Sequence, residues 1–362
     1  MSGAILERLR PWLFAARRAA ALLFLAAPLF GGGTITYVAR ETVEDPGLAA
    51  RLAATGGAEA RRLVVALSEE TTLPGVDLCI APGSVEQADD PDLARRFDAA
   101  DVLVLRGGSF SAWYRTAYPP GRRSHLAQAL QDFLEAEKPI VAHGGACRFL
   151  SGGVPEPWEE LERWLDAKRR NPRRRDSHEA RVALGVGPRA LFDAGDWGAG
   201  APARLLDALH RTRVDPGFLF VGEVALEFSR ERGELRVLGP GEVLVLDLDR
   251  ARRGKRSVDG ARLSRLLEGD RWEFAHRRPV VDGTREGQCP TPSGEAAAAA
   301  RETELTSPAL SSWLLEQAAD PRRQRRIVAA GRRWSLGWDS ASALHGEGAK
   351  ASVTRVPFEC RW

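Results

Sequence analysis

The side chain best suited to act as a nucleophile in this chain is Cys147, which follows a glycine-rich turn. Pro139–Ala142 has the pattern of a short buried strand, and residues 143–146 lead from it into a predicted helix that carries Cys147. A helix N-terminus and a neighbouring Arg148 both favour the thiolate, which is the reactive form of cysteine. Phe149 stands where a nucleophile turn requires a small residue. The alternative is therefore an inert, half-buried cysteine in the first helical turn.

His143 ends the same predicted strand and is the candidate general base for Cys147. Ligands of α/β proteins bind at the carboxyl ends of the strands, which is where His143 is expected. A general base must lie within hydrogen-bond reach of the proton that it removes, and adjacency in sequence does not ensure this. A structural histidine is the alternative.

Two glycine pairs, Gly107-Gly108 and Gly144-Gly145, each follow an apolar strand pattern. Both pairs are expected at one edge of the sheet, because the carboxyl ends of parallel strands meet there. Backbone N–H groups at such turns bind anions. These four glycines are therefore the candidate binding residues for a peptide or a small carboxylate, with ordinary turn glycines as the alternative.

The elements that would position these residues are apolar strands alternating with amphipathic helices from about residue 31 onward. Leu63–Leu67, Val102–Leu105 and Pro139–Ala142 are continuous apolar runs, typical of parallel strands buried on both faces. Leu126–Ala136 has a helical pattern, and Phe218–Glu227 has the pattern of one further strand. The alternation predicts an α/β fold of three layers around a mostly parallel sheet.

The order of these segments resembles the cyanophycinase and aspartyl dipeptidase (dipeptidase E) family of serine peptidases over roughly residues 20–282. The matching segments are Ala58–Val65 for "GG-x-x-A-R-I-V-V", Val104–Gly108 for "F-x-G-G-D-Q", Lys138–Ala142 before "G-T-S-A-G-A", Ala203–Leu209 after "D-Q-H-F", Gly217–Leu226 for "G-I-G-I-D-E-x-T-A-L" and Glu234–Gly241 for "E-V-x-G-x-G". The resemblance implies a flavodoxin-like or class I glutamine-amidotransferase-like fold.

The resemblance breaks at the positions that carry the family's chemistry. The family's serine falls on Gly144 or Gly145, and neither residue has a side chain. The family's histidine, which accepts the serine proton, has no counterpart over Asp193–Trp197. Because the scaffold motifs remain readable while the site is lost, the sequence indicates a divergent member with a degenerate active site.

Two functional classes remain open on the sequence alone. The favoured one is a pseudoenzyme that works as a non-catalytic binding or interaction module at the glycine-rich edge. The alternative is an active peptide or isopeptide hydrolase in which Cys147 is the nucleophile and His143 the base. No P-loop, dinucleotide fingerprint or zinc spacing occurs, so no cofactor is expected.

Composition limits the partners further. The 52 basic and 49 acidic residues give a net charge of +3, and the two kinds interleave, which argues against a nucleic-acid partner. The four cysteines, Cys79, Cys147, Cys289 and Cys360, fit no metal-site spacing, and pairing of the last two stays open. Formation of a homodimer is also left open.

The two ends of the chain differ in character from its middle. Residues 1–20 are a basic extension or part of a signal peptide, and 19–30 is an apolar run too short to span a membrane. That run is either a first strand, Leu22–Phe30, in a cytoplasmic protein, or the core of an export signal. The expected organisation is then an α/β domain over 21–282, a linker over 283–305 and an extension over 306–362 that contains Trp313, Trp334, Trp338 and Trp362.

Overall fold

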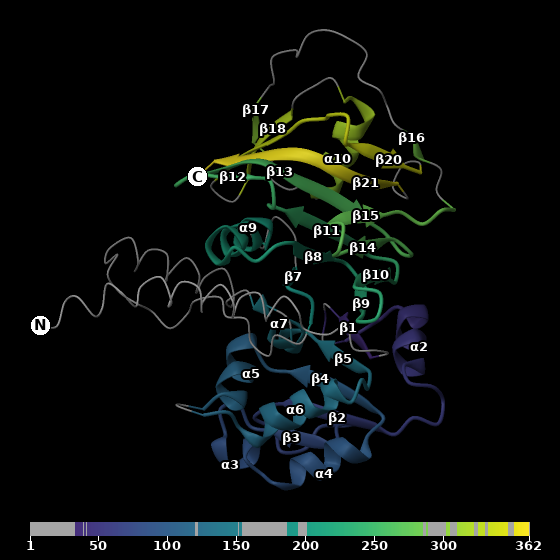
Figure 1. The fold of residues 1–362 in the computed structure, drawn as a ribbon, viewed down its shortest axis with the longest axis vertical. Coiled ribbons are helices and arrows are strands. Elements are labelled where there is room, and N and C mark those ends of the chain that lie inside the picture. The colour runs from purple at the N-terminus through teal and green to yellow at the C-terminus, as the bar shows by residue number, and fades with distance from the viewer. Residues whose placement is uncertain are drawn as a thin grey trace, which may run out of the picture.

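The fold is a mixed α/β arrangement of two large sheets, shown in Figure 1. The computed structural model describes residues 33–38, 40, 42–119, 122–150, 152–153, 187–194, 201–284, 287–288, 302–304, 310–321, 325–329, 332–346 and 351–361. The proposed first strand Leu22–Phe30 lies outside these residues.

The first sheet has nine strands in the order β15-β14-β10-β9-β1-β5-β4-β2-β3. Its parallel half consists of β1 (Thr34–Val38), β5 (Ile140–His143), β4 (Val102–Gly107), β2 (Arg62–Leu67) and β3 (Leu78–Ile80). Its antiparallel half consists of β9 (Ala225–Ser229), β10 (Glu234–Leu238), β14 (Arg271–Glu273) and β15 (Arg278–Val280). The prediction that β2, β4 and β5 are parallel neighbours in one sheet is confirmed.

The second sheet has twelve strands, nine of them in the order β17-β18-β19-β21-β13-β11-β8-β7-β6. They are β6 (Gly152–Gly153), β7 (Leu191–Ala194), β8 (Gly217–Val221), β11 (Glu242–Asp247), β13 (Ser257–Leu266), β17 (Glu302–Glu304), β18 (Arg325–Ala329), β19 (Arg332–Leu336) and β21 (Ser352–Arg361), with β12 (Arg252–Arg253), β16 (Gly287–Gln288) and β20 (Ala343–His345) at the side. Because β21 pairs with β13, the C-terminal segment belongs to the sheet that also holds β7 and β8.

The expectation of a single, mostly parallel sheet is therefore wrong: both sheets mix parallel and antiparallel strands. The segment Phe218–Glu227 is also not one strand. Gly222, with φ +78°, separates β8 from β9, and the two strands belong to different sheets. A glycine tolerates this left-handed backbone, so the chain crosses from one sheet to the other at that point.

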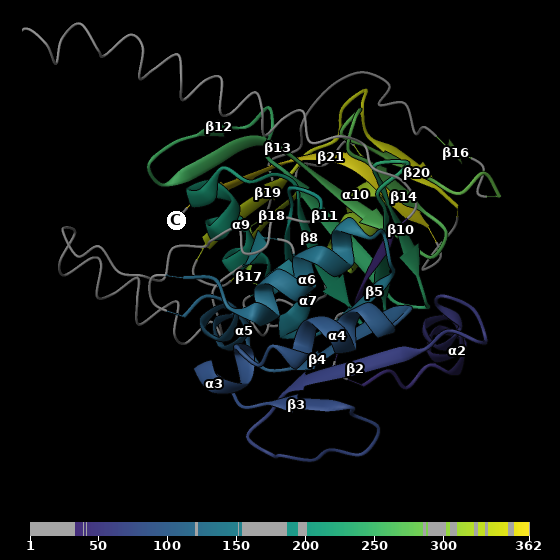
Figure 2. The same cartoon turned by 60° about the horizontal axis from the view of Figure 1, so that its bottom comes forward.

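Helices cover the parallel half of the first sheet and the second sheet. They are α2 (Pro46–Ala54), α3 (Val85–Ala88), α4 (Asp92–Ala99), α5 (Phe110–Ala117), α6 (His125–Glu135), α7 (Gly145–Leu150), α9 (Ala201–Thr212) and α10 (Leu310–Ala319). Figure 2 shows α4 and α6 side by side next to β4. The predicted helix over 126–136 is confirmed as α6, which Ser124 caps and whose leucines are buried. No helix in the described part of the chain is long and apolar enough to cross a membrane.

The two sheets share one apolar core where β1 faces β7. The ring of Tyr37 on β1 stacks on Phe192 of β7 with centroids 4.5 Å apart, and Phe192 in turn stacks on Phe218 of β8. Helix α7 contributes Cys147 and Phe149 to the same cluster. The turn into α7 is therefore fixed between the two sheets, and the candidate residues lie at this junction.

Candidate functional site

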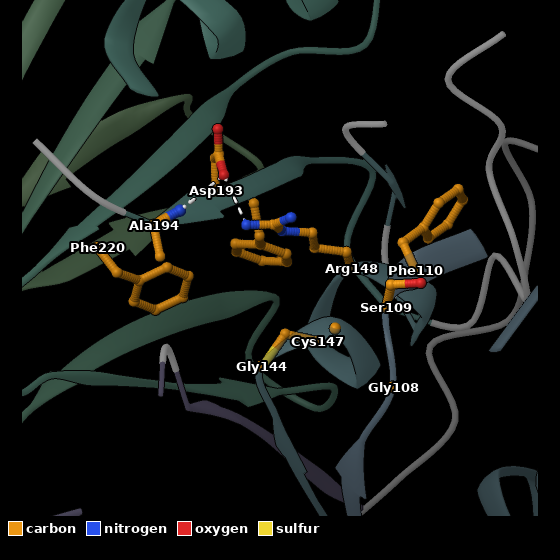
Figure 3. A pocket seen from close by; sticks show the side chains of 11 residues that line it. Gly108, Ser109, Phe110, Gly144, Cys147, Arg148, Asp193, Ala194 and Phe220 are labelled. Carbon is orange, nitrogen blue, oxygen red and sulfur yellow. Dashed lines mark hydrogen bonds and ion pairs between the residues drawn. The ribbon is translucent and has the colours of Figure 1, made fainter. Parts of the chain in front are cut away.

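A cavity of about 230 Å³ lies where two strand-to-helix turns of the first sheet meet β7 and β8 of the second sheet (Figure 3). The β4–α5 turn contributes Gly108, Ser109 and Phe110; the β5–α7 turn and α7 contribute Gly144, Gly145, Cys147 and Arg148; and the strands contribute Phe192, Asp193, Ala194 and Phe220. The cavity thus brings together four of the six candidate residues, Gly108, Gly144, Gly145 and Cys147. It does not include Gly107 or His143.

The β5–α7 turn leaves no room for a side chain at its second glycine. A Cβ atom on Gly145 would lie 2.2 Å from the carbonyl oxygen of Gly108 and 2.9 Å from Cα of Ser109. Gly144 has φ +52°, a left-handed conformation that favours glycine. The two glycine turns are therefore in direct backbone contact, and this contact requires that residue 145 have no side chain.

The β4–α5 turn is held by helix α5. Trp113 of α5 donates its indole N–H to the carbonyl of Gly107 at 2.8 Å, which gives Gly107 a structural role behind the cavity. Ser109 caps α5, and its hydroxyl accepts the N–H of Ala112 at 3.1 Å. The N-terminus of α5, the positive end of the helix dipole, thus borders the cavity.

Cys147 touches the cavity but is almost completely buried, with 2% of its surface exposed. Its sulfur lies 2.8 Å from the carbonyl oxygen of Ala142 and 3.0 Å from that of Val38. A carbonyl oxygen accepts a hydrogen bond only from the protonated thiol, and two such oxygens repel a thiolate. These contacts stabilise the unreactive form of the side chain.

His143 lies on the other face of the first sheet. Val141, two residues earlier on β5, packs with Leu48 of α2, whereas Ala142 packs in the cluster that contains Cys147. Because side chains alternate along a strand, His143 points to the α2 face. Its Nδ1 lies 3.1 Å from the carbonyl oxygen of Arg40, and burial lowers its pKa to about 4. His143 and Cys147 are therefore not arranged as a base and a nucleophile.

The charged group at the cavity wall is a cluster that we call the open cluster: Arg148, Asp193 and Arg204. Nη2 of Arg148 donates to Oδ1 of Asp193 at 2.7 Å. Arg204 of α9 holds the same carboxylate with two bonds, Nε to Oδ2 at 2.6 Å and Nη2 to Oδ1 at 2.9 Å. Figure 3 shows Arg148 reaching from α7 towards Asp193 on β7, so the cluster ties the two sheets together across the cavity.

The open cluster carries an excess of positive charge. Among the described residues, two guanidinium groups face one carboxylate, so the cluster carries a net charge of +1. The side chain of Arg148 is 21% exposed, whereas those of Asp193 and Arg204 are 0% and 7% exposed. Within the described part of the chain, Arg148 donates to Asp193 through Nη2, and its side chain lines the cavity.

Sequence reasoning missed the open cluster. It treated Arg148 as a neighbour of the cysteine and Asp193 as the start of a stretch without histidine. The signal in the sequence was a lone carboxylate inside the apolar strand Leu191–Ala194, since a buried charge requires a partner. Arg204 is 11 residues away from Asp193 and Arg148 is 45 residues away, so the sequence does not identify the partners.

No group of three or more His, Cys, Asp or Glu side chains within the described ranges is placed to hold a metal ion.

No protein-family model and no curated protein matches this chain. Among solved structures, a peptidase from an acI-B1 Actinobacterium is similar with a TM-score of 0.47 and 13% identity, over 67% of this chain and 97% of that one. A putative peptidase E protein from Listeria monocytogenes EGD-e is similar with a TM-score of 0.35 and 8% identity, over 57% and 96% of the two chains. Likeness at this level transfers no activity to the present chain.

Proposed function

We propose that this chain is a divergent, non-catalytic homologue of the cyanophycinase and dipeptidase E family that binds a small carboxylate in the cavity beside Arg148. The family assignment rests on the ordered sequence motifs. This family assignment implies that the parallel half of the first sheet derives from a flavodoxin-like or glutamine-amidotransferase-like fold.

The observation that carries the binding role is the net positive charge of the open cluster. Arg148 lines a cavity that opens to solvent, and charge-assisted hydrogen bonds from guanidinium to carboxylate are among the stronger polar contacts in proteins. The N-terminus of α5 adds further positive potential at the same wall. A carboxylate in the cavity would neutralise the excess charge.

The absence of catalysis is supported by the residues that line the cavity. They include no histidine. Ser109, the serine among them, uses its hydroxyl as a helix cap, and Cys147 donates its thiol to backbone carbonyls. An oxygen or sulfur nucleophile requires a positioned base or a stabilised anion, and the described lining offers neither.

The test combines a hydrolysis assay with a binding assay on the full chain. We expect no release of product from β-aspartyl-arginine or other aspartyl dipeptides by the wild type. We expect a panel of small carboxylates (acetate, succinate and phenylacetate) to give at least one member whose calorimetric titration saturates. Hydrolysis that persists in Cys147→Ala would place an active site elsewhere and overturn the proposal.

Hydrolysis that Cys147→Ala abolishes would favour the alternative, a cysteine hydrolase. The position of Cys147 at the cavity wall keeps this alternative testable. Labelling of Cys147 itself by iodoacetamide at pH 7, located by mass spectrometry of peptides and distinguished from labelling of the free, half-buried Cys79, would be the accompanying sign. We expect slow labelling instead, because the buried thiol is held by two carbonyl oxygens.

A further inference from the structure

We propose that the cavity selects a small monocarboxylate with an apolar body and no ammonium group, of the arylacetate type. This inference rests on the proposed binding function and narrows it to one chemical class. It is carried by three features of the described lining: its net charge, its hydrogen-bond acceptors and its aromatic wall.

The charge at the cavity matches a single carboxylate. Arg148 and Asp193 line the cavity with one positive and one negative charge, and Arg204, which is bonded to Asp193 outside the lining, adds a second positive charge. One bound carboxylate brings this group of charges to neutrality, whereas a second carboxylate would be desolvated without a partner at a cost that opposes binding. A dicarboxylate therefore fits the described lining less well than a monocarboxylate.

Among the described residues, the lining holds no carboxylate that is left to pair with an ammonium group. Asp193 is its acidic residue, and both carboxylate oxygens already accept hydrogen bonds from Arg148, Arg204 and the backbone N–H of Ala194. The carbonyl oxygen of Gly108 is covered by Gly145, against which it packs. An amino acid or a dipeptide would bring a cation next to Arg148 with no counter-charge, which disfavours it relative to the same acid without nitrogen.

Part of the remaining lining is apolar. Phe192 and Phe220 come from the adjacent strands β7 and β8, their ring centroids lie 5.8 Å apart, and only Phe220 keeps a small exposed surface, 3%. Ala194, which pairs with Phe220 in the register of these strands, adds a small apolar surface beside them. Aromatic rings gain contact energy from another ring in offset or edge-to-face packing.

The size of the cavity sets the size of the ligand. Its volume of about 230 Å³ lies below the ~300–1,000 Å³ typical of pockets for drug-sized molecules. A compact acid with one ring fits this scale, and an extended peptide would reach beyond it. Together with the charge at the cavity and its lining residues, this volume favours a small acid such as phenylacetate over the terminus of a peptide.

The experiment is isothermal titration calorimetry of the full wild-type chain with four matched probes. Phenylacetate is compared with phenylacetamide, which lacks the charge, with L-phenylglycine, which adds an ammonium group to the same carbon skeleton, and with succinate, which replaces the ring by a carboxymethyl group. We expect phenylacetate to bind at least tenfold more tightly than each of the others. Equal or tighter binding of phenylglycine or succinate would overturn the inference and leave the proposed carboxylate-binding function intact.

Saturation by phenylacetamide but by none of the acids would overturn both proposals, as would failure of every probe to bind. In Arg148→Met we expect phenylacetate to bind about 10-fold or more weakly, as for loss of a hydrogen bond between charged groups. Arg95→Met, which removes an exposed arginine of α4 outside the lining, is the matched control and should bind like the wild type. Phe220→Leu should weaken phenylacetate and leave the weak binding of succinate unchanged; an equal effect on both would count against the aromatic wall.

Discussion

Helix α9 takes part in two buried ion clusters that differ in their charge balance. The open cluster, Arg148–Asp193–Arg204, has two cations for one anion and reaches the cavity. One turn further along α9, Asp207 pairs with Arg332 of β19, and Nη1 of Arg332 also donates to the carbonyl of Ala203 at 2.8 Å. We call this second pair the closed cluster, because both of its side chains are almost fully buried and their charges cancel.

The comparison of charge balance distinguishes a buried charge pair that stabilises the fold from a buried charge that can attract a ligand. The closed cluster docks the C-terminal segment on α9, and its balanced charges leave no attraction for a ligand. In the open cluster, Arg204 holds the carboxylate with two hydrogen bonds, and Arg148 adds a further cation at the cavity wall. We infer binding from this additional charge because a guanidinium group at a cavity wall can pair with an anionic ligand.

The largest effect on stability should come from Asp193→Asn. The substitution keeps the shape of the side chain but removes the negative charge that Arg148 and Arg204 share, and it replaces one acceptor oxygen by an NH2 donor that faces a guanidinium group. Breaking a buried ion pair from one side costs about 3–5 kcal/mol. Urea unfolding followed by circular dichroism measures the loss. Asp92→Asn, which affects an exposed pair with Arg95, is the control and should cost about 0–1 kcal/mol.

The closed cluster should respond to Arg332→Met almost as strongly, with a loss of about 3 kcal/mol, because Asp207 is left buried and unpaired. The double variant Arg332→Met/Asp207→Leu removes both charges, and it should recover most of the free energy of unfolding that Arg332→Met loses. Replacing a balanced buried pair by apolar side chains is often neutral. No recovery in the double variant would mean that α9 docks through the ionic contact itself, which would remove the proposed difference between the clusters.

The sequence analysis predicted correctly those strands and helices that depend on local sequence patterns. The three parallel strands β2, β4 and β5 are continuous apolar runs, and their helices carry serine caps and periodic leucines. The second sheet was not predicted as a separate sheet. Its strands β8 and β13 are separated in sequence from their partners by other elements. The bend at Gly222 directs β9 into the first sheet although β8 belongs to the second.

The meeting of the two glycine turns was predicted for the same reason, whereas the functional role of the residues there stays a prediction. The two glycine turns meet because parallel strands end at one edge, and this could be read from spacing. The side of the sheet on which His143 lies could not be read, because every residue of β5 is buried and the pattern does not alternate. The open cluster depends on contacts among β7, α7 and α9, which only the three-dimensional arrangement supplies.

A third prediction concerns the contact between the glycine turns below the open cluster. Gly145→Ser should cost at least ~2 kcal/mol, in the range of substitutions that overpack a core, because its Cβ meets the backbone oxygen of Gly108 at 2.2 Å. Gly144→Ser should cost about 1–2 kcal/mol for its left-handed φ of +52°. Neither serine should produce hydrolysis of aspartyl dipeptides, since the described lining holds no base. Thermal unfolding ranks the two variants, and a smaller loss in Gly145→Ser than in Gly144→Ser would contradict the packing described for this turn.

The smallest effect on stability, and the sharpest test of the difference between the clusters, belongs to Arg148→Met. Arg204 keeps its two hydrogen bonds to Asp193 in this variant, and the repulsion between the two guanidinium groups is removed. The side chain of Arg148 is partly exposed, so the loss should stay within ~1 kcal/mol, as for exposed ion pairs. The same variant should lose carboxylate binding, whereas Arg332→Met/Asp207→Leu should keep it, provided that α9 stays docked. Urea unfolding and calorimetric titration of the two proteins side by side measure both quantities. A loss of 3 kcal/mol or more in Arg148→Met would show that this arginine is needed for folding, and the excess charge at the cavity would then no longer be evidence for a ligand.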